Sequence, residues 1–132
     1  MSLRILIVDD ETNARRSLAI SLKLAGHRVH DAADGYAALA VLESDPIDLA
    51  LVDLMMPDMS GLELARQINV RHQHVRVVLV SAYHLSKRQL ERMDCGAIGF
   101  VPKPFEMDEL LAFIERKSVP PSVEIEAEAV NG

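Results

Sequence analysis

Five polar residues stand directly after, or close behind, short apolar runs of the sequence: Asp9, Asp10, Asp53, Ser81 and Lys103. Three carboxylates, a hydroxyl and an amine suit phosphoryl transfer, because a carboxylate can attack phosphorus and form an acyl phosphate. The transferring group needs alignment and charge neutralisation more than covalent help. Acids gathered in a small space repel one another unless a cation joins them, and hard oxygen ligands favour Mg²⁺. These residue types predict a metal-assisted phosphoryl site if the fold brings them together.

The segments between these residues alternate in character. Short aliphatic runs typical of strands buried on both faces alternate with amphipathic segments of helical length. The expected strands are residues 5–8, 28–32, 49–52, 75–80 and 98–101. The expected helices are residues 12–24, 35–44, a segment capped by Ser60, 86–95 and 106–116. This strict alternation predicts an α/β domain with a five-stranded parallel sheet and helices on both faces.

The carboxyl ends of the strands are where ligands bind in open parallel sheets. Neighbouring strands lie about 4.8 Å apart. If the first, third, fourth and fifth strands are adjacent, Asp53 lies between the acidic pair and Ser81, and its central place makes it the nucleophile candidate. Asp9 and Asp10 are then candidate metal ligands, with Asp10 the more direct one. Lys103 is a compact charge suited to phosphate.

Composition bounds the function classes. The chain has 132 residues, one domain by length, and a net charge of −6, which argues against nucleic-acid binding by this domain. Its single cysteine excludes a disulfide within the chain and suits the reducing cytoplasm. No run approaches the roughly 18 apolar residues that a membrane span needs. We therefore expect a cytoplasmic domain that does not contact a membrane.

The C-terminal segment differs from the rest. The expected domain covers residues 1–117, and Pro120-Pro121 follows its last helix. Residues 123–129 then alternate apolar and acidic side chains. We interpret residues 118–132 as an acidic tail or the start of a linker, with a strand that pairs elsewhere as the alternative.

Four motifs carry a resemblance to a known family. They are VDDE at 8–11, LVDLMMPDMSG at 51–61, VSA at 80–82 and FVPKPF at 100–105. Together they resemble the receiver domain of bacterial two-component response regulators, of the chemotaxis-regulator kind, from about Arg4 to Lys117. The resemblance implies a flavodoxin-like doubly wound fold with strand order 2-1-3-4-5. It also implies a regulator that catalyses only its own phosphorylation and slow dephosphorylation.

The resemblance further implies roles for single residues. Asp53 would be phosphorylated by a sensor histidine kinase or a phosphotransfer protein. Asp10, Asp53 and the backbone carbonyl of Met55 would bind Mg²⁺ directly, and Asp9 would act through water. On phosphorylation Ser81 would move toward the phosphoryl group. Phe100, which lacks the hydroxyl of the tyrosine often found there, would turn inward.

That switch would change the surface formed by the segments 86–95, 98–101 and 106–116. The changed surface would control an output domain or a protein partner, and the resemblance allows a homodimer through it.

Met55 and Tyr83 lie two residues after Asp53 and Ser81, where they would flank the path of a hydrolytic water. Neither is a strong general base near neutral pH, so we expect slow loss of the phosphoryl group; the alternative is that both only pack there.

Three rival functions would need residues or site features that differ from those of this chain. A flavodoxin-like electron carrier would need a glycine- and hydroxyl-rich phosphate loop where this chain has Asp9-Asp10-Glu11. A haloacid-dehalogenase-like phosphatase would need a second acid where this chain has Met55. A pseudo-receiver that acts only through protein contacts would not need the full set of acids, hydroxyl and lysine.

Two further expectations concern the surface and the core: Arg15 lies on a solvated helix face, and Cys95 is a small buried residue.

Overall fold

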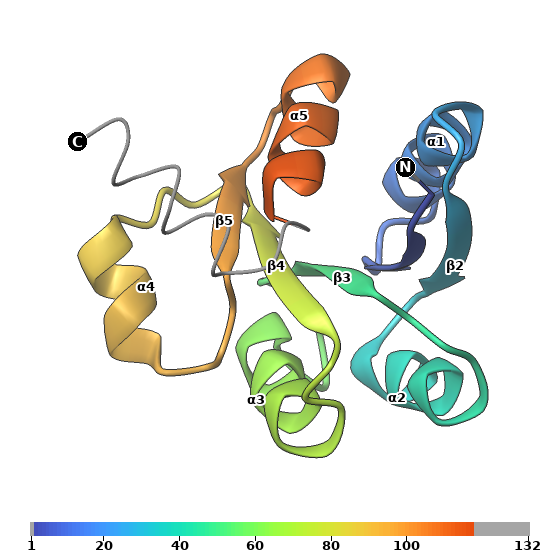
Figure 1. The fold of residues 1–132 in the computed structure, drawn as a ribbon. Helices are drawn as coiled ribbons and strands as arrows, with labels where there is room; N and C mark the ends of the chain where they lie inside the picture. The colour runs from blue at the N-terminus through green and yellow to red at the C-terminus, as the bar shows by residue number, and fades with distance from the viewer. Residues whose placement is uncertain (1, 118–132) are drawn as a thin grey trace, which may run out of the picture.

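Strands and helices alternate through residues 2–117, the part of the chain that the computed structural model describes (Figure 1). The strands are β1 (Arg4–Val8), β2 (Arg28–Ala32), β3 (Leu49–Asp53), β4 (Arg76–Ser81) and β5 (Gly99–Pro102). The helices are α1 (Thr12–Leu24), α2 (Gly35–Ser44), α3 (Gly61–Arg71), α4 (Lys87–Met93) and α5 (Met107–Lys117). The expected tail at 118–132 lies outside the described residues.

The five strands form one parallel sheet in the order β2-β1-β3-β4-β5. This order confirms the flavodoxin-like doubly wound topology. The register sets the site, because Val8 of β1 lies opposite Val52 of β3, and Ser81 of β4 lies opposite Pro102 of β5. The residues that follow β1 and β5, and those that end β3 and β4, therefore lie along one edge of the sheet.

Helices cover both faces of the sheet, with α1 and α5 on one side and α2 and α3 on the other (Figure 1). Alternate strand residues face each layer, as the pleat requires. Ile5, Ile7, Leu49 and Leu51 pack toward α1 and α5. Leu6, Val8, Ala50 and Val52 pack toward α2 and α3. Double burial of this kind explains why the strands are continuous aliphatic runs.

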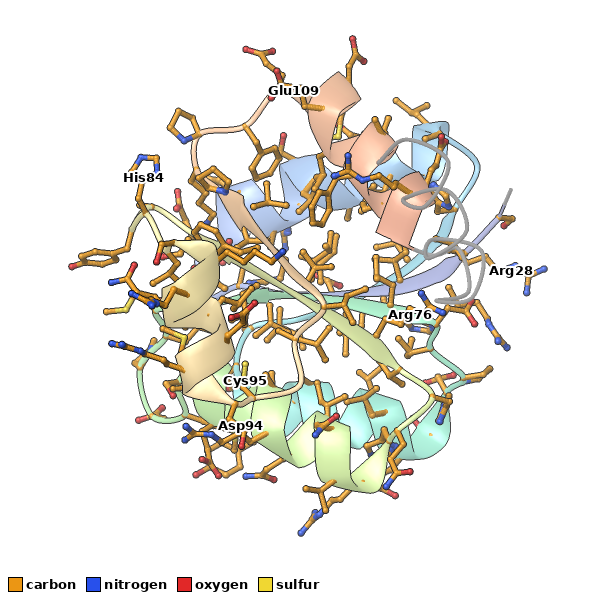
Figure 2. All side chains as sticks on the ribbon, turned by 60° about the vertical axis from the view of Figure 1, so that its left-hand side comes forward. Arg28, Arg76, His84, Asp94, Cys95 and Glu109 are labelled. Carbon is orange, nitrogen blue, oxygen red and sulfur yellow. The ribbon has the colours of Figure 1, made fainter. Side chains whose placement is uncertain are left out.

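The ends of several elements follow local chemistry. The side chains of Asp34, Ser60 and Ser86 each accept a hydrogen bond from the backbone at the start of α2, α3 and α4. Gly26 has φ of 99°, the left-handed conformation expected after α1. α4 is shorter than expected and ends before Cys95, which is buried as expected (Figure 2).

The two edges of the sheet carry different residues. Figure 2 shows Arg28 and Arg76, the first residues of β2 and β4, at one end of the strands, and His84, which follows β4, at the other end. β3 and β4 each extend one residue beyond the expected strand. Asp53 and Ser81 are therefore the last residues of their strands, held by the sheet rather than by a loop.

No helix of residues 2–117 has the length and apolar character that crossing a bilayer requires.

Candidate functional site

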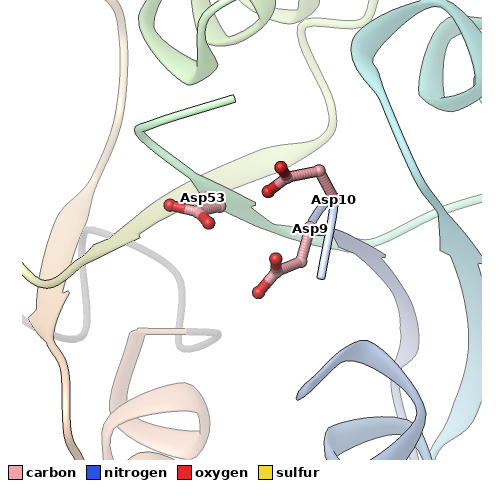
Figure 3. Close-up of side chains that lie close together, drawn as sticks. All are labelled: Asp9, Asp10 and Asp53. Atoms are coloured by element: carbon pink, nitrogen blue, oxygen red, sulfur yellow. The ribbon is translucent and has the colours of Figure 1, made fainter. Parts of the chain in front are cut away.

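Three carboxylates converge at the carboxyl edge of the sheet. Asp9, Asp10 and Asp53 each offer an oxygen within 4.8 Å of the others (Figure 3). Asp9 is buried, Asp53 is partly buried and Asp10 is exposed, so the group opens from the edge of the sheet toward solvent. The register of β1 against β3 causes this convergence, because it aligns the ends of two neighbouring strands. This acidic group confirms the prediction that the first and third strands deliver their acids to one place.

Lys103, which directly follows β5, extends its side chain to the acidic group. Its backbone N–H donates to the Ser81 carbonyl at 2.7 Å, which ties the segment after β5 to the end of β4. Its Nζ then lies 3.0 Å from Asp9 Oδ2 and 3.6 Å from Asp53 Oδ2. The amine therefore bridges two carboxylates across three strands, and its hydrogen bond goes to Asp9.

The charges of this group are unbalanced. Burial raises the pKa of Asp53, with the carboxylates of Asp9 and Asp10 acting in the same direction, against the Met55 N–H and Lys103. Burial alone would lower the pKa of Lys103, but the hydrogen bond that Lys103 donates to Asp9 and the charges of both carboxylates outweigh it and raise that pKa. One ammonium thus faces three acids. A divalent cation with oxygen ligands fits the remaining negative charge.

We predict that the burial of Asp53, together with the neighbouring acids, makes the stability of the metal-free protein depend on pH. Because the pKa of Asp53 is raised in the folded state, its proton stabilises the fold at low pH. That contribution is lost as the pH rises through the raised pKa. Relative to Asp53→Asn, the wild type should therefore lose stability as the pH rises from the ordinary aspartate pKa, about 4, through the raised pKa of Asp53. Urea denaturation of both proteins in a chelating buffer measures the difference, and parallel pH curves would contradict the prediction.

The residues around Asp53 hold its carboxylate and the loop behind it. The Met55 N–H donates to Asp53 Oδ1 at 3.1 Å, which fixes the direction of the carboxylate. The Gly61 N–H donates to the Leu54 carbonyl, and a Cβ at Gly61 would meet the Asp53 carbonyl. A glycine at this position therefore lets α3 begin directly against the end of β3.

Ser81 is fully buried, and its Oγ accepts a hydrogen bond from the Tyr83 N–H at 3.1 Å. Met55 and Tyr83 are 56% and 63% exposed, so each presents its side chain to solvent two residues after the end of β3 or β4. Phe100 is partly buried and lines a groove between α4, β5 and α5. The structure thus places Ser81 at the end of β4, the strand beside the one that Asp53 ends, and leaves Phe100 on the expected face.

Arg15 departs from the expectation of a solvated helix face. Its side chain is only 12% exposed. Nε donates to Asp31 Oδ2 of β2 at 2.8 Å, and a terminal nitrogen donates to the Asp9 carbonyl at 2.8 Å. The reason is that α1 begins beside the end of β2, so its first turn faces the sheet. The sequence signal for this pair is an acid near the end of the second strand, which gains meaning only once β1 and β2 are known to be neighbours.

The comparison with known families decides between the alternatives. The family model described as the response regulator receiver domain matches residues 5–115. The chain belongs to this family. A receiver is a phosphorylated regulator rather than an enzyme with a substrate of its own, so membership excludes the electron-carrier and phosphatase alternatives. The acidic group formed by Asp9, Asp10 and Asp53 is typical of phosphoacceptor receivers.

Individual relatives agree. The receiver is 39% identical to the response regulator MprA of Mycobacterium ulcerans over 112 residues, which are 85% of this chain and 48% of the relative. It superposes on a CheY-like receiver domain protein of Methanospirillum hungatei with a TM-score of 0.82 and 31% identity, covering 89% of this chain and 94% of that one. The response regulator TrrA of Thermotoga maritima, solved in complex with Mg²⁺–BeF, gives a TM-score of 0.78 and 34% identity over 89% and 99% of the two chains.

Some of these relatives are longer than this chain. The chain spans about half the length of MprA, or 48%. Receivers of this family work with histidine kinases and with output domains.

Proposed function

We propose that Asp53 accepts a phosphoryl group from a sensor histidine kinase or a phosphotransfer protein in a reaction that requires Mg²⁺. The observation that carries this proposal is the convergence of three carboxylates and one ammonium at a single edge of the sheet. Asp9, Asp10, Asp53 and the backbone carbonyl of Met55 would hold the ion, with Asp9 acting through water. Bound there, Mg²⁺ supplies charge neutralisation for the transferring phosphoryl oxygens.

The chain's own residues align the reaction. A carboxylate oxygen of Asp53 attacks phosphorus as the bond from phosphorus to the donor's imidazole nitrogen breaks, so one P–O bond replaces one P–N bond. The Met55 N–H holds the other carboxylate oxygen. Lys103 already lies beside Asp53, where its ammonium can pair with a phosphoryl oxygen.

The switch begins at Ser81. Its Oγ accepts from the Tyr83 N–H, and the hydroxyl proton stays available for a phosphoryl oxygen. Movement of this buried side chain toward Asp53 vacates space that the ring of Phe100 can enter. Because Phe100 lines the groove between α4, β5 and α5, its rotation changes that face. A local charge change thus biases a two-state surface.

The partners follow from the same proposal. The face formed by α4, β5 and α5 would control an output domain or a separate protein, and a homodimer through this face is compatible with it. The receiver would act in the cytoplasm, which its one buried cysteine suits. Residues 1–117 would form the receiver, followed by a linker or tail at 118–132. A pseudo-receiver function is the alternative that the phosphorylation experiment tests.

Phosphorylation without a kinase provides the direct test. We expect acetyl phosphate and Mg²⁺ to add one phosphoryl group per chain, seen in the intact mass. The same mixture with excess chelator should leave the mass unchanged, because three acids without the ion repel an incoming phosphate. An unmodified wild-type chain in Mg²⁺ would contradict the proposal and favour the pseudo-receiver.

Met55 and Tyr83, which are exposed two residues after Asp53 and Ser81, bear on the lifetime of the phosphoryl group. Neither Met55 nor Tyr83 can activate water near neutral pH, so we expect the phosphoryl group to outlast the time scale of seconds. Met55→Gln should shorten this lifetime several-fold, because the amide can hold a water near phosphorus. The intact mass, followed over time after removal of the phosphodonor, measures the lifetime of the phosphoryl group in the wild type and in Met55→Gln. Decay of the wild type within seconds would contradict the prediction.

A further inference from the structure

The most deeply placed charged side chain of α1 is the arginine that was expected in solvent. Arg15 donates to a carboxylate of β2 and to a backbone carbonyl at the end of β1. It lies beside the acidic group, but it contacts the peptide that carries two of the acids rather than a carboxylate of the site. This contact suggests a role in placing those acids.

The hydrogen bond from Arg15 is made to the turn between β1 and α1, where the acids Asp9 and Asp10 lie. The carbonyl that Arg15 holds belongs to the peptide bond between Asp9 and Asp10. Because a peptide is planar, fixing its oxygen fixes the plane from which both side chains leave. Two backbone N–H groups add restraints here: the Asp9 N–H donates to the Ala32 carbonyl at 3.2 Å, and the Glu11 N–H donates to Asp9 Oδ1 at 2.9 Å. Both of these restraints hold Asp9.

The position of the Asp10 carboxylate depends on the backbone that carries it. Asp9 is held by Lys103 and by the Glu11 N–H. Within residues 2–117, by contrast, no side chain or backbone group holds the Asp10 carboxylate by a hydrogen bond or an ion pair. Its position is set by the peptide before it, and the donor on that peptide's oxygen is Arg15.

We propose that Arg15 is a positioning residue for the metal site, which orients Asp10 through the Asp9–Asp10 peptide and is itself anchored by Asp31. A guanidinium suits this task because its planar fork donates in two fixed directions at once. The salt bridge with Asp31 also balances the charge of Arg15, so its effect on the ion is geometric rather than repulsive. This inference rests on the proposed function, since it concerns Mg²⁺ binding by the same acids.

Mg²⁺ affinity is the measurement that tests the role. The chain has no tryptophan, so the titration is followed by NMR shifts of backbone amides and by calorimetry. We expect Arg15→Gln to weaken Mg²⁺ binding about 10-fold, as loss of a group that orients a metal ligand does. Arg15→Lys should weaken it comparably, because one ammonium cannot serve both acceptors. Arg16→Gln is the matched control, since it removes the same charge from an exposed neighbour and should bind as the wild type does.

The outcomes separate this inference from the proposed function. If the wild type and Arg16→Gln fail to bind Mg²⁺, the proposed site itself is wrong and the role of Arg15 falls with it. If they bind and Arg15→Gln binds equally well, only the role of Arg15 is overturned. Full affinity in Arg15→Lys would also overturn it, because charge alone would then suffice. Should Arg15→Gln not fold, Asp31→Ala removes the acceptor that anchors Arg15, at a 45% exposed side chain, and should still weaken binding measurably; unchanged affinity there overturns the role.

Discussion

Replacement of Asp53 by asparagine is expected to abolish phosphorylation by acetyl phosphate and to increase the stability of the metal-free domain. The amide is a poor nucleophile toward phosphorus, so the acyl phosphate cannot form. It also removes a charge that is partly buried and lies beside two other acids, and the raised pKa of Asp53 reflects first this burial and then the neighbouring acids. Relief of such crowding is worth roughly 0.5–2 kcal/mol in comparable substitutions. Intact mass and urea denaturation measure the two effects on the same samples.

Asp58→Asn is the matched control for this substitution. Asp58 is exposed, lies in the loop that follows β3 and has φ of 66°, a conformation that asparagine tolerates. We expect this variant to be phosphorylated like the wild type and to gain no stability of this kind. A phosphoryl group on Asp53→Asn would place the acceptor elsewhere. Equal stabilisation of both variants would show that net charge, and not the acidic group, is responsible.

The sequence predicts the edge of the sheet well because strand ends are local features. Asp53 and Ser81 each complete an aliphatic run, and a parallel sheet brings such ends together whatever the side chains touch. Apolar periodicity likewise predicts α1 and α2 with their observed bounds. Strand order is different, because alternation alone is compatible with several orders. The order 2-1-3-4-5 came from the resemblance of the motifs.

Side-chain partners were harder to predict, because they depend on pairs far apart in the chain. The hydrogen bond of Lys103 goes to Asp9, 94 residues away, rather than to the nucleophile candidate. Arg15 pairs with Asp31, and no helical or strand period links the two. Ser81 is tied to a backbone N–H of its own loop, which reflects the detailed path after β4. Each of these contacts needs the tertiary distances that periodicity does not contain.

Lys103→Gln is expected to slow phosphorylation of Asp53 by about 100-fold, the scale on which loss of one donor to a transition-state oxygen acts. The ammonium lies 3.6 Å from Asp53 Oδ2, so it is placed to neutralise charge that develops on the phosphoryl oxygens. Lys23→Gln is the matched control, because it removes the same charge from the exposed last turn of α1. The rate of mass increase at saturating Mg²⁺ provides the comparison.

The same substitution should strengthen Mg²⁺ binding while it weakens phosphorylation. Without its ammonium the site presents three carboxylates and no resident cation, and the repulsion between Lys103 and an incoming ion disappears. A variant that had merely lost its fold would lose both properties, so opposite changes identify a direct role in the chemistry. If Lys103→Gln bound Mg²⁺ more weakly than the wild type, Lys103 would instead serve to assemble the acids, through its 3.0 Å contact with Asp9.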